Sequence, residues 1–447
     1  MLDPAAPRPL DLTSLDSYLS SCLALAQERL AGFSSLEEVA RAEADLNCYP
    51  RLEILGDPRD IFVADERSLS AGDIALAAES LLSGRVLLEH ACAGEATRLG
   101  LGAKYLLNPR RDFVGPVWER LRAEGLAYEV RPEQLRPLGL GQRHMLQLAW
   151  DLWRLAEEMG RDPATALANQ HLLVIVNQAS AEAVLADFRQ ANFYGFNRAQ
   201  TMFMVQAAFP GLTVDEGRWR VDHASPVRLH NHGQMLMQTA MEGQLFRLNP
   251  RGRRLPLPWS DFAGVLEGLD DKVSFNIEDL DYLAQSLDLT GLAAALKLGA
   301  KGARMVMEVV GNNPLAPIKG GACSFDPVLG RNVIIESFQL RGLAPKDIAF
   351  LNKNVNHYPR PLTALTTARE RGLSMPLCVK DGRLYFQPVQ GDLNFLLPTA
   401  FLRRGKLKPI RAWKALVDTP AALAAMARQD SRPGFLTWAA SLTGLQV

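Results

Sequence analysis

The sequence lacks several features that define common classes of protein. It has only five cysteines in 447 residues, and no two of them have Cys-x-x-Cys spacing. Their odd number and wide scatter argue against a disulfide framework and a zinc knuckle, and favour a reducing compartment. No apolar run approaches the roughly 18 residues of a membrane span, and the N-terminus has no basic start followed by an apolar run. We therefore expect a cytoplasmic protein with no membrane partner.

An excess of charge of one sign is also absent. Lysine plus arginine equals aspartate plus glutamate, 49 against 49. No global basic field therefore exists to attract nucleic acid, and a phosphate-bearing ligand would have to be bound by a local site. We find neither low-complexity sequence nor an internal repeat, including the hexapeptide repeat of β-helices. The balance of 48% hydrophobic and 22% charged residues is typical of a globular protein.

The sequence does contain an alternation of strand-like and helix-like segments. Helical spacing at 180–190 follows one strand pattern directly, and a second helical stretch at 288–299 separates two later ones. Alternating strands and helices predict an α/β fold with a mixed, mainly parallel sheet. The predicted strands lie at 85–91, 171–178, 200–206, 272–277, 303–310 and 332–340.

Helical segments flank this predicted core. Apolar residues recur at helical spacing from Leu10 to about Ala44, with Ser14 and Ser34 or Ser35 as candidate N-caps. We predict three parts. They are an N-terminal helical subdomain at 1–80, a central α/β domain at 81–380 with a helical insertion at about 115–169, and a C-terminal subdomain at 381–447.

The loop AGEATRLGLGAK, residues 93–104, directly follows the first predicted strand. Its glycines allow backbone amides to approach phosphate oxygens, and Arg98 and Lys104 supply positive charge. The loop has neither the pattern of a P-loop nor the Gly-x-Gly-x-x-Gly of a dinucleotide fold, and an ordinary strand-to-helix turn can have a similar composition. The order and nature of the segments that follow it must decide its meaning.

The loop resembles that of the UDP-glucose and UDP-N-acetylglucosamine pyrophosphorylase superfamily, which reads approximately GGxGTRLG with a lysine a few residues later. The corresponding residues here are 93–100 and Lys104. Alanine stands at 93 and 96 where the family has glycine. The similarity continues through seven segments in the family's order, over about residues 86–416. It implies a Rossmann-like, glycosyltransferase-A-type nucleotidyltransferase core in the central domain.

The resemblance assigns the nucleotide to three stretches. In the loop, it implies that Arg98 and Lys104 hold the triphosphate. FMVQAAFPGL resembles the strand that ends in a uracil-reading glutamine, although a lone glutamine at a strand end is often structural. LHNHGQ resembles the family's PxGHGD, where glycine lies against the base; its two histidines also have metal-site spacing, but a polar turn before a helix explains them better. The implied nucleotide contacts are Ala93, Gly94, Thr97, Gln206, His232 and Gly233.

The segment VSFNIEDLD resembles the family's NxDNL, in which the asparagine contacts the sugar and the aspartate orients Mg²⁺ and phosphate. The register matches Asn276 and Glu278, and Asp279 could take the metal role instead. Carboxylate oxygens suit Mg²⁺, but acidic residues at a helix start are as commonly partners of the helix dipole. Both interpretations stay open at this point.

Three later segments complete the resemblance. EVVGNNPLAPIKGG followed by VIIESFQ is similar to the family's EVxxKxxxDxKGG and LLExxQ, which implies sugar contacts from Gly320 and Glu336. FLNKNVNHY is similar to FNTNNLW and places Asn354 against the sugar. KLKPIRAWKAL resembles RFxPVKxxxDL, with Arg411 at the position of the phosphate-binding lysine.

The resemblance implies a uridylyltransferase that makes a UDP-sugar and pyrophosphate from UTP and a sugar 1-phosphate, with glucose 1-phosphate favoured by the KGG segment. The expected cofactor is Mg²⁺, and the expected catalytic residues are Arg98, Lys104 and Arg411. An N-acetylhexosamine 1-phosphate is the alternative sugar. A non-catalytic sugar-nucleotide-binding protein is the alternative class, because Glu95 lies among the phosphate-binding residues. A glycosyltransferase would need a DxD-like motif, to which only residues 277–279 come near.

Overall fold

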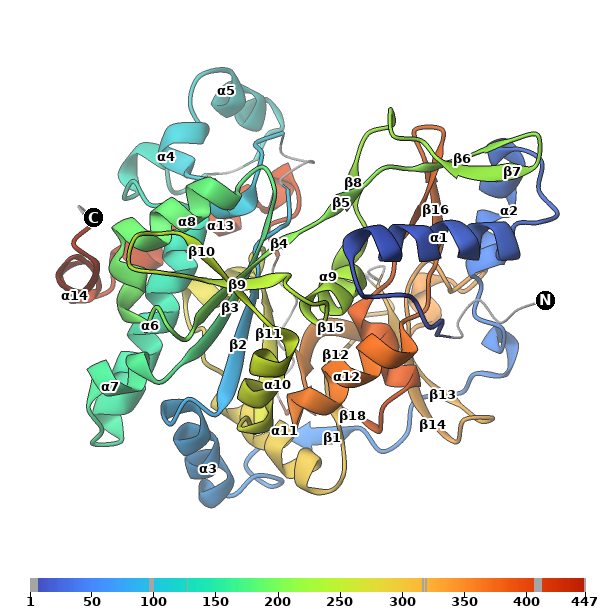
Figure 1. Ribbon diagram of the computed structural model, residues 1–447. Coiled ribbons are helices and arrows are strands. Elements are labelled where there is room, and N and C mark those ends of the chain that lie inside the picture. Colours follow the sequence, from blue (N-terminus) through green and yellow to red (C-terminus); the bar gives the residue numbers. More distant parts are fainter. Residues whose placement is uncertain are drawn as a thin grey trace.

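A computed structural model describes residues 7–95, 100–126, 128–315, 317, 320–405 and 412–445. Its described residues form a 12-stranded mixed sheet with the path β1-β18-β12-β15-β11-β2-β3-β4-β9-β10, and the hairpin β13–β14 attaches to β15. Neighbours β11, β2, β3 and β4 are parallel, whereas β15 runs antiparallel to both β11 and β12. The predicted α/β class and the mixed, mainly parallel sheet are confirmed (Figure 1).

The strands of this sheet overlap all six predicted segments, although β14 ends at Ile335, five residues before the predicted end. Strands β15 and β18 carry polar residues among apolar ones, so their patterns were weaker and no strand was predicted there. The sheet strands are β1 (Phe62–Ala64), β2 (Val86–Ala91), β3 (His171–Asn177), β4 (Thr201–Gln206), β9 (Leu245–Leu248), β10 (Arg254–Leu257), β11 (Asp271–Asn276), β12 (Met305–Gly311), β13 (Ala322–Asp326), β14 (Arg331–Ile335), β15 (Phe350–His357) and β18 (Thr399–Arg404).

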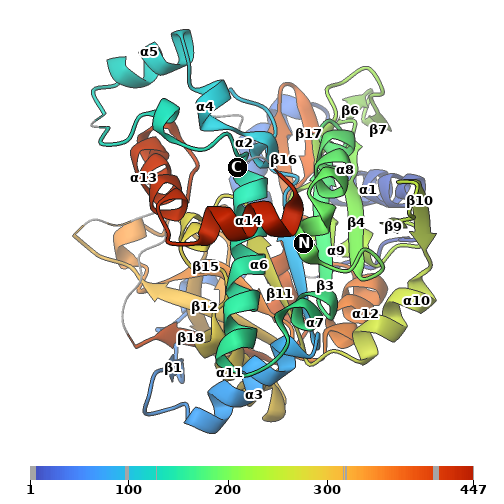
Figure 2. The ribbon, with the colours of Figure 1, turned by 90° about the vertical axis from the view of Figure 1, so that its left-hand side faces the viewer.

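Helices cover both faces of the sheet (Figures 1 and 2). Along β2, Val86 and Leu88 pack into one core with α3, α6, α8 and α11, whereas Leu87 packs into a second core with α1, α9, α10 and α12. This alternation follows from the period of two in a strand. The helices are α1 (Leu15–Arg29), α2 (Leu36–Asn47), α3 (Ala71–Leu82), α4 (Pro109–Asp112), α5 (Pro116–Ala123), α6 (Leu140–Glu158), α7 (Pro163–Ala168), α8 (Ala181–Gln190), α9 (Asn231–Thr239), α10 (Trp259–Glu267), α11 (Leu289–Ala300), α12 (Pro361–Arg371), α13 (Thr419–Asp430) and α14 (Phe435–Thr443).

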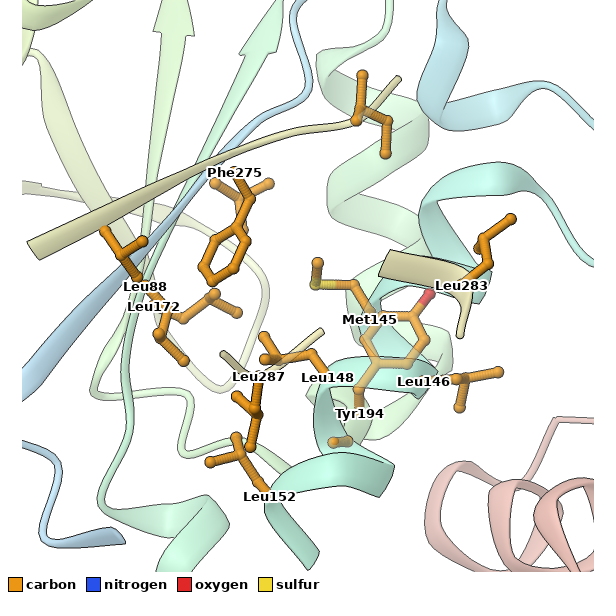
Figure 3. Packing of buried hydrophobic residues seen from close by; sticks show 14 of the residues in the cluster. Leu88, Met145, Leu146, Leu148, Leu152, Leu172, Tyr194, Phe275, Leu283 and Leu287 are labelled. Carbon is orange, nitrogen blue, oxygen red and sulfur yellow. The ribbon is translucent and has the colours of Figure 1, made fainter. Parts of the chain in front are cut away.

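The larger core lies between the sheet and the predicted helical insertion. Leu88, Leu172 and Phe275 of the strands face Leu148 and Leu152 of α6, and all five are at most 5% exposed (Figure 3). Burying each such side chain stabilises the fold by about 1.5–3 kcal/mol. The insertion is thus a packed layer of the molecule.

Helix starts agree with the caps read from the sequence. Ser14 accepts a hydrogen bond from the backbone N–H of Ser17, and Ser35 from that of Glu38, so Ser35 rather than Ser34 is the second N-cap. Ser34 instead donates to the carboxylate of Glu38. Among the described residues, no helix is both long and apolar enough to span a membrane.

The sheet extends beyond the predicted central domain. Strand β1 comes from the N-terminal part and β18 from the C-terminal part, and the two pair in parallel at one edge. A small sheet of β16 (Leu377–Lys380), β17 (Arg383–Phe386), β6 (Leu212–Asp215) and β7 (Arg218–Val221) also joins distant segments. The three-part division stays a prediction, and its flanks contribute to the central sheet. Short strands such as β1 have too few residues to show a period.

Candidate functional site

The predicted site segments meet at one edge of the sheet because they follow parallel strands. Ala91 pairs with Asn276 at the end of β11 and with Ile175 of β3. Asn177 pairs with Gln206 at the end of β4. The carboxyl ends of parallel strands are the usual place for ligands in α/β sheets. The structure therefore brings the loop at 93–95, Gln206 and residues 276–279 to the same edge.

The described part of the glycine-containing loop is held by backbone contacts. Asn177 donates its side-chain amide to the carbonyl of Ala93 at 2.9 Å. The N–H of Lys104 donates to the carbonyl of Gly94 at 3.1 Å, and Glu95 forms a bridge with Ala103. Gly94 and Glu95 are exposed, as a ligand-binding loop requires. The predicted site residues Thr97, Arg98 and Arg411 lie outside the described residues.

Glu278 is the centre of an ion-paired cluster at this edge. Lys104 Nζ bonds to its Oε2, and Lys414 Nζ lies 3.1 Å from its Oε1. Burial would raise the pKa of Glu278, but the charges of Lys104 and Lys414 outweigh burial and lower it. The carboxylate is thus ionised and shared by two lysines.

Lys414 is a candidate site residue that the sequence interpretation missed. It lies three residues after Arg411, in the same segment that resembles the family's phosphate-binding stretch. The backbone N–H of Trp413 donates to the carbonyl of Glu278 at 2.8 Å, and Ala412 bridges to Asp279. These contacts place the lysine beside Glu278. A lysine three residues after Arg411 was the available signal.

Asp279 does not share the position of Glu278. Its Oδ1 accepts a hydrogen bond from the N–H of Asp281 at 2.9 Å and caps the short helix η5 (Leu280–Leu283). Burial is the main cause that raises its pKa to about 6. Its side chain lines a cavity together with Glu308 and Lys353. Of the two predicted metal ligands, only Glu278 therefore lies within the lysine cluster.

Gln206 is 4% exposed and has a defined orientation. Its Nε2 donates to the carbonyl of Asn231 at 2.9 Å and to Oε1 of Gln234 at 3.0 Å. Gln234 in turn donates to Oε1 of Gln238 at 2.8 Å. This chain of amides commits the nitrogen of Gln206 internally and leaves its oxygen as the group for a ligand. Gln234 and Gln238 were not predicted, because a buried glutamine in a helix has no distinctive sequence pattern.

The two histidines of LHNHGQ do not converge. His230 Nδ1 bonds to the hydroxyl of Tyr18 at 3.0 Å, whereas His232 Nδ1 accepts the backbone N–H of Gln390 at 2.9 Å. Burial lowers the pKa of His232 to about 4, so its ring is neutral. Within the described ranges, no three His, Cys, Asp or Glu side chains are grouped to hold a metal ion. The arrangement agrees with the polar turn expected before a helix.

Gly233 allows helix α9 to pack directly against the backbone at residue 388. Its N–H donates to the carbonyl of Pro388 at 2.9 Å. A Cβ at this glycine would lie 2.4 Å from the carbonyl carbon of Pro388. No larger residue fits without displacing the helix.

The predicted sugar residues lie on the same side of the sheet as α9. Glu336 Oε1 is buried and has no hydrogen-bond partner among the described residues. Burial raises the pKa of this carboxyl. A Cβ at Gly391 would lie 3.6 Å from this oxygen and 3.9 Å from the side-chain nitrogen of Asn352. A buried carboxyl oxygen without a hydrogen-bond partner is suited to accepting a hydrogen bond from a hydroxyl group.

The other three residues predicted to contact the sugar are more exposed than Glu336. Asn354 is exposed at φ 60°, in the left-handed region, and its Oδ1 accepts a hydrogen bond from Asn352 at 3.0 Å. Asn276 is exposed at the end of β11 and accepts the N–H of Glu278 at 3.2 Å. Gly320 is half-buried and packs near Leu351, at the N-terminal end of β15.

The segment PVQGD, residues 388–392, connects the two halves of the candidate site. Pro388 contacts Gly233, Gln390 bonds to His232, and Gly391 lies beside Glu336. Gln390 also donates to the hydroxyl of Tyr358 at 2.6 Å, which anchors the segment to the sheet. The sequence interpretation assigned no role to this segment. Its glycine beside proline and glutamine resembles an ordinary turn.

Comparisons with known proteins were made for the whole chain. A scan against models of protein families finds no match, and a search of curated proteins finds none either. Solved structures do match. A UDP-N-acetylglucosamine pyrophosphorylase from Trypanosoma brucei, solved with an inhibitor, superposes with a TM-score of 0.60 at 14% identity, covering 91% of this chain and 79% of that one.

A mutant UDP-glucose pyrophosphorylase from Leishmania major, solved with UDP-glucose, superposes with a TM-score of 0.53 at 14% identity. The match covers 83% of this chain and 70% of that one. This chain has the fold of the UDP-sugar pyrophosphorylases. The fold implied by the sequence resemblance is therefore confirmed, and it is shared with enzymes named for two different sugars.

We predict that Gly233→Ala destabilises the protein by about 1–3 kcal/mol, because the new methyl group overlaps the backbone of Pro388. The matched control is Gly264→Ala in α10, where a Cβ meets nothing within 4 Å. Replacing a helical glycine in open space should stabilise by up to about 1 kcal/mol. Urea unfolding of both variants measures the difference. Equal stability of the two variants would contradict the packing at Gly233.

We also predict that Asp392→Asn changes how stability depends on pH. Asp392 is 1% exposed, and burial followed by the charge of Glu336 raises the pKa of its carboxyl well above 3.8. The folded protein therefore binds this proton more tightly than the unfolded chain, so stability decreases as pH rises from about 4 through the raised pKa. The variant should lose less stability between pH 5 and pH 8 than the parent, in urea unfolding at both pH values.

The exposed Asp57 provides the control for this measurement. Asp57→Asn should keep the parent's difference in stability between the two pH values, because its carboxyl is in contact with water. A parent-like pH dependence in Asp392→Asn would show that the buried carboxyl has no elevated affinity for a proton.

Proposed function

We propose that this protein is a uridylyltransferase that makes a UDP-sugar and pyrophosphate from UTP and a sugar 1-phosphate, with glucose 1-phosphate as the favoured sugar. The observation that carries the proposal is the cluster of Lys104, Glu278 and Lys414 beside the loop that follows β2. Two lysines next to exposed loop backbone at the carboxyl end of a parallel sheet form a local site for phosphate groups. The shared fold supports this interpretation.

The proposed reaction requires positioning and charge neutralisation. An oxygen of the sugar 1-phosphate attacks the α-phosphorus of UTP, the bond between that phosphorus and the bridging oxygen to the β-phosphate breaks, and pyrophosphate leaves. No protein nucleophile takes part. Lys104 and Lys414 exchange Glu278 for phosphate oxygens when the triphosphate binds. From the sequence resemblance, Arg98 and Arg411 add further charge around the phosphates.

We propose Glu278 as the protein ligand of Mg²⁺. Mg²⁺ is usually bound through one or two carboxylates, with phosphate oxygens and water completing its shell. Glu278 supplies ionised oxygens at the position where the phosphates are proposed to lie, whereas Asp279 is turned toward a separate cavity. A bound Mg²⁺ would help to neutralise the leaving pyrophosphate.

The base and the sugar are proposed to bind on either side of residues 388–392. The free oxygen of Gln206 accepts the N–H of the uracil ring, and Gly233 lies against the base. The unpaired oxygen of Glu336 faces the sugar hydroxyls, with Asn352 and Asn354 beside it. An N-acetylhexosamine is the second candidate sugar, because one of the matched structures is an N-acetylglucosamine enzyme.

We predict that the purified protein releases pyrophosphate with Mg²⁺, UTP and glucose 1-phosphate, and not with other common nucleoside triphosphates. A panel of sugar 1-phosphates that includes N-acetylglucosamine 1-phosphate identifies the sugar. Release of UDP from a UDP-sugar and an acceptor would instead indicate a glycosyltransferase. Binding of UDP-glucose by calorimetry without pyrophosphate release across the panel would indicate a non-catalytic binding protein.

We predict that Lys104→Ala lowers kcat by about 100- to 1,000-fold, because it removes a charge that stabilises the leaving pyrophosphate. Lys297→Ala is the matched control, since Lys297 pairs with Asp73 at 2.9 Å on the far helix α11. The control should keep parent-like kcat. A similar kcat for Lys104→Ala and the parent would remove this lysine from the phosphate site.

A further inference from the structure

The cavity that Asp279 lines is on the opposite face of the sheet from the proposed sugar contacts. It has a volume of about 280 Å³. Strands β2, β11, β12 and β15 form its floor, and η5 with the start of α11 covers it. Three of its lining residues, Leu88, Phe275 and Leu287, are labelled in Figure 3.

Strand alternation separates this cavity from the candidate active site. On β12, Met307 packs toward Gly391 and Glu336, whereas its neighbour Glu308 lines the cavity. On β15, Asn352 approaches Gly391, whereas Lys353 lines the cavity. Successive side chains of a strand point to opposite faces. The two sites therefore share strands without sharing a space.

A buried histidine provides a defined acceptor in the cavity lining. His357 is 3% exposed, and its Nδ1 bonds to Oδ2 of Asp271 at 2.6 Å. In the neutral ring, a carboxylate at Nδ1 would hold the N–H on that nitrogen and leave Nε2 as an acceptor. In the part of the chain that the structure describes, no residue hydrogen-bonds to Nε2. His357 thus offers an unpaired ring nitrogen in the lining of the cavity, to which a ligand can hydrogen-bond.

The electrostatics of the cavity favour a positive ligand. Its lining contains the four carboxylates of Asp279, Asp281, Asp288 and Glu308. Lys353 bonds to Glu308 at 3.1 Å, and Arg404 bonds to both Glu308 and Asp288. Asp279 and Asp281 form no ion pair with any described residue, so the lining keeps an excess of negative charge.

The opposite wall is apolar. Val86, Leu88, Val273 and Phe275 are each at most 8% exposed and present aliphatic and aromatic groups to the cavity. Such a surface binds a hydrocarbon body, and a few polar groups fix its orientation. A bare metal ion would leave this wall without contacts.

We propose that this cavity binds an organic ammonium compound with an apolar body. The hydrocarbon lies on Leu88, Val273 and Phe275. The ammonium group lies between Asp279 and Asp281 and donates a hydrogen bond to Nε2 of His357. The proposal is independent of the uridylyltransferase reaction, because no residue of the lysine cluster lines the cavity.

The test is calorimetric titration of the full chain with 2-phenylethylammonium chloride and with its uncharged analogue 2-phenylethanol. We expect the ammonium probe to bind at least tenfold more tightly than the alcohol. Asp281→Asn should reduce this ratio, whereas the control Asp215→Asn, on an exposed aspartate of β6, should keep it. Equal affinity of the two probes, or binding of neither, overturns the proposal.

Two further measurements locate the probe. Leu289→Trp places an indole in the cavity and should abolish binding of the ammonium probe, whereas Leu76→Trp at an exposed position of α3 should not. Circular dichroism establishes whether both variants fold. If Leu289→Trp does not fold, the comparison of Asp281→Asn with Asp215→Asn still tests the proposal. Saturating UTP should leave the affinity unchanged; displacement by UTP would assign the probe to the nucleotide site and overturn the inference.

Discussion

The candidate site depends on one carboxylate that two lysines share. Glu278 pairs with Lys104 from the loop after β2 and with Lys414 from the C-terminal part of the chain. The side chains of Lys104 and Glu278 are 11% and 16% exposed, so water screens their attraction less than it would on the open surface. This cluster ties together three segments that are far apart in sequence. Both lysines therefore already have an anionic partner at this edge of the sheet.

The cluster exists because of how the strands pair. Parallel pairing of β2 with β11 aligns Ala91 with Asn276, so the segments that follow them begin side by side. The same two strands also carry a buried ion pair between Glu89 and Lys272, with a separation of 2.9 Å. Both residues come before the strand ends at Ala91 and Asn276. Breaking such a pair leaves a buried charge without a partner, which is strongly unfavourable. The Glu89–Lys272 pair thus favours the same pairing of β2 with β11 that aligns Ala91 with Asn276.

Alternation along the same strands gives the protein two chemically different faces. On the side of α9, Glu336 and Asn352 pack around Gly391. On the other side, His357, Asp279 and Glu308 line a cavity with an apolar wall. Residues 388–392 add a second constraint on the first face, because Gly233 packs against the backbone of Pro388 and Gly391 lies beside Glu336. Small changes in this segment would alter both contacts at once.

The sequence by itself determined the α/β class, the six strongest strands, the N-cap Ser14, and the order of the segments that resemble the pyrophosphorylases. These features are local, since periodicity, caps and glycine-containing turns are encoded within a few residues. They also placed Gln206 at the end of one predicted strand and Glu278 at the end of another.

Only the tertiary structure decided the rest. It showed that Glu278 pairs with Lys414, whereas its neighbour Asp279 lines a separate cavity. It also placed β1 and β18 together at the edge of the sheet. It also showed the amide chain behind Gln206 and the role of residues 388–392. Most of these depend on contacts between residues more than 20 positions apart, and neither a short window nor a period carries that information.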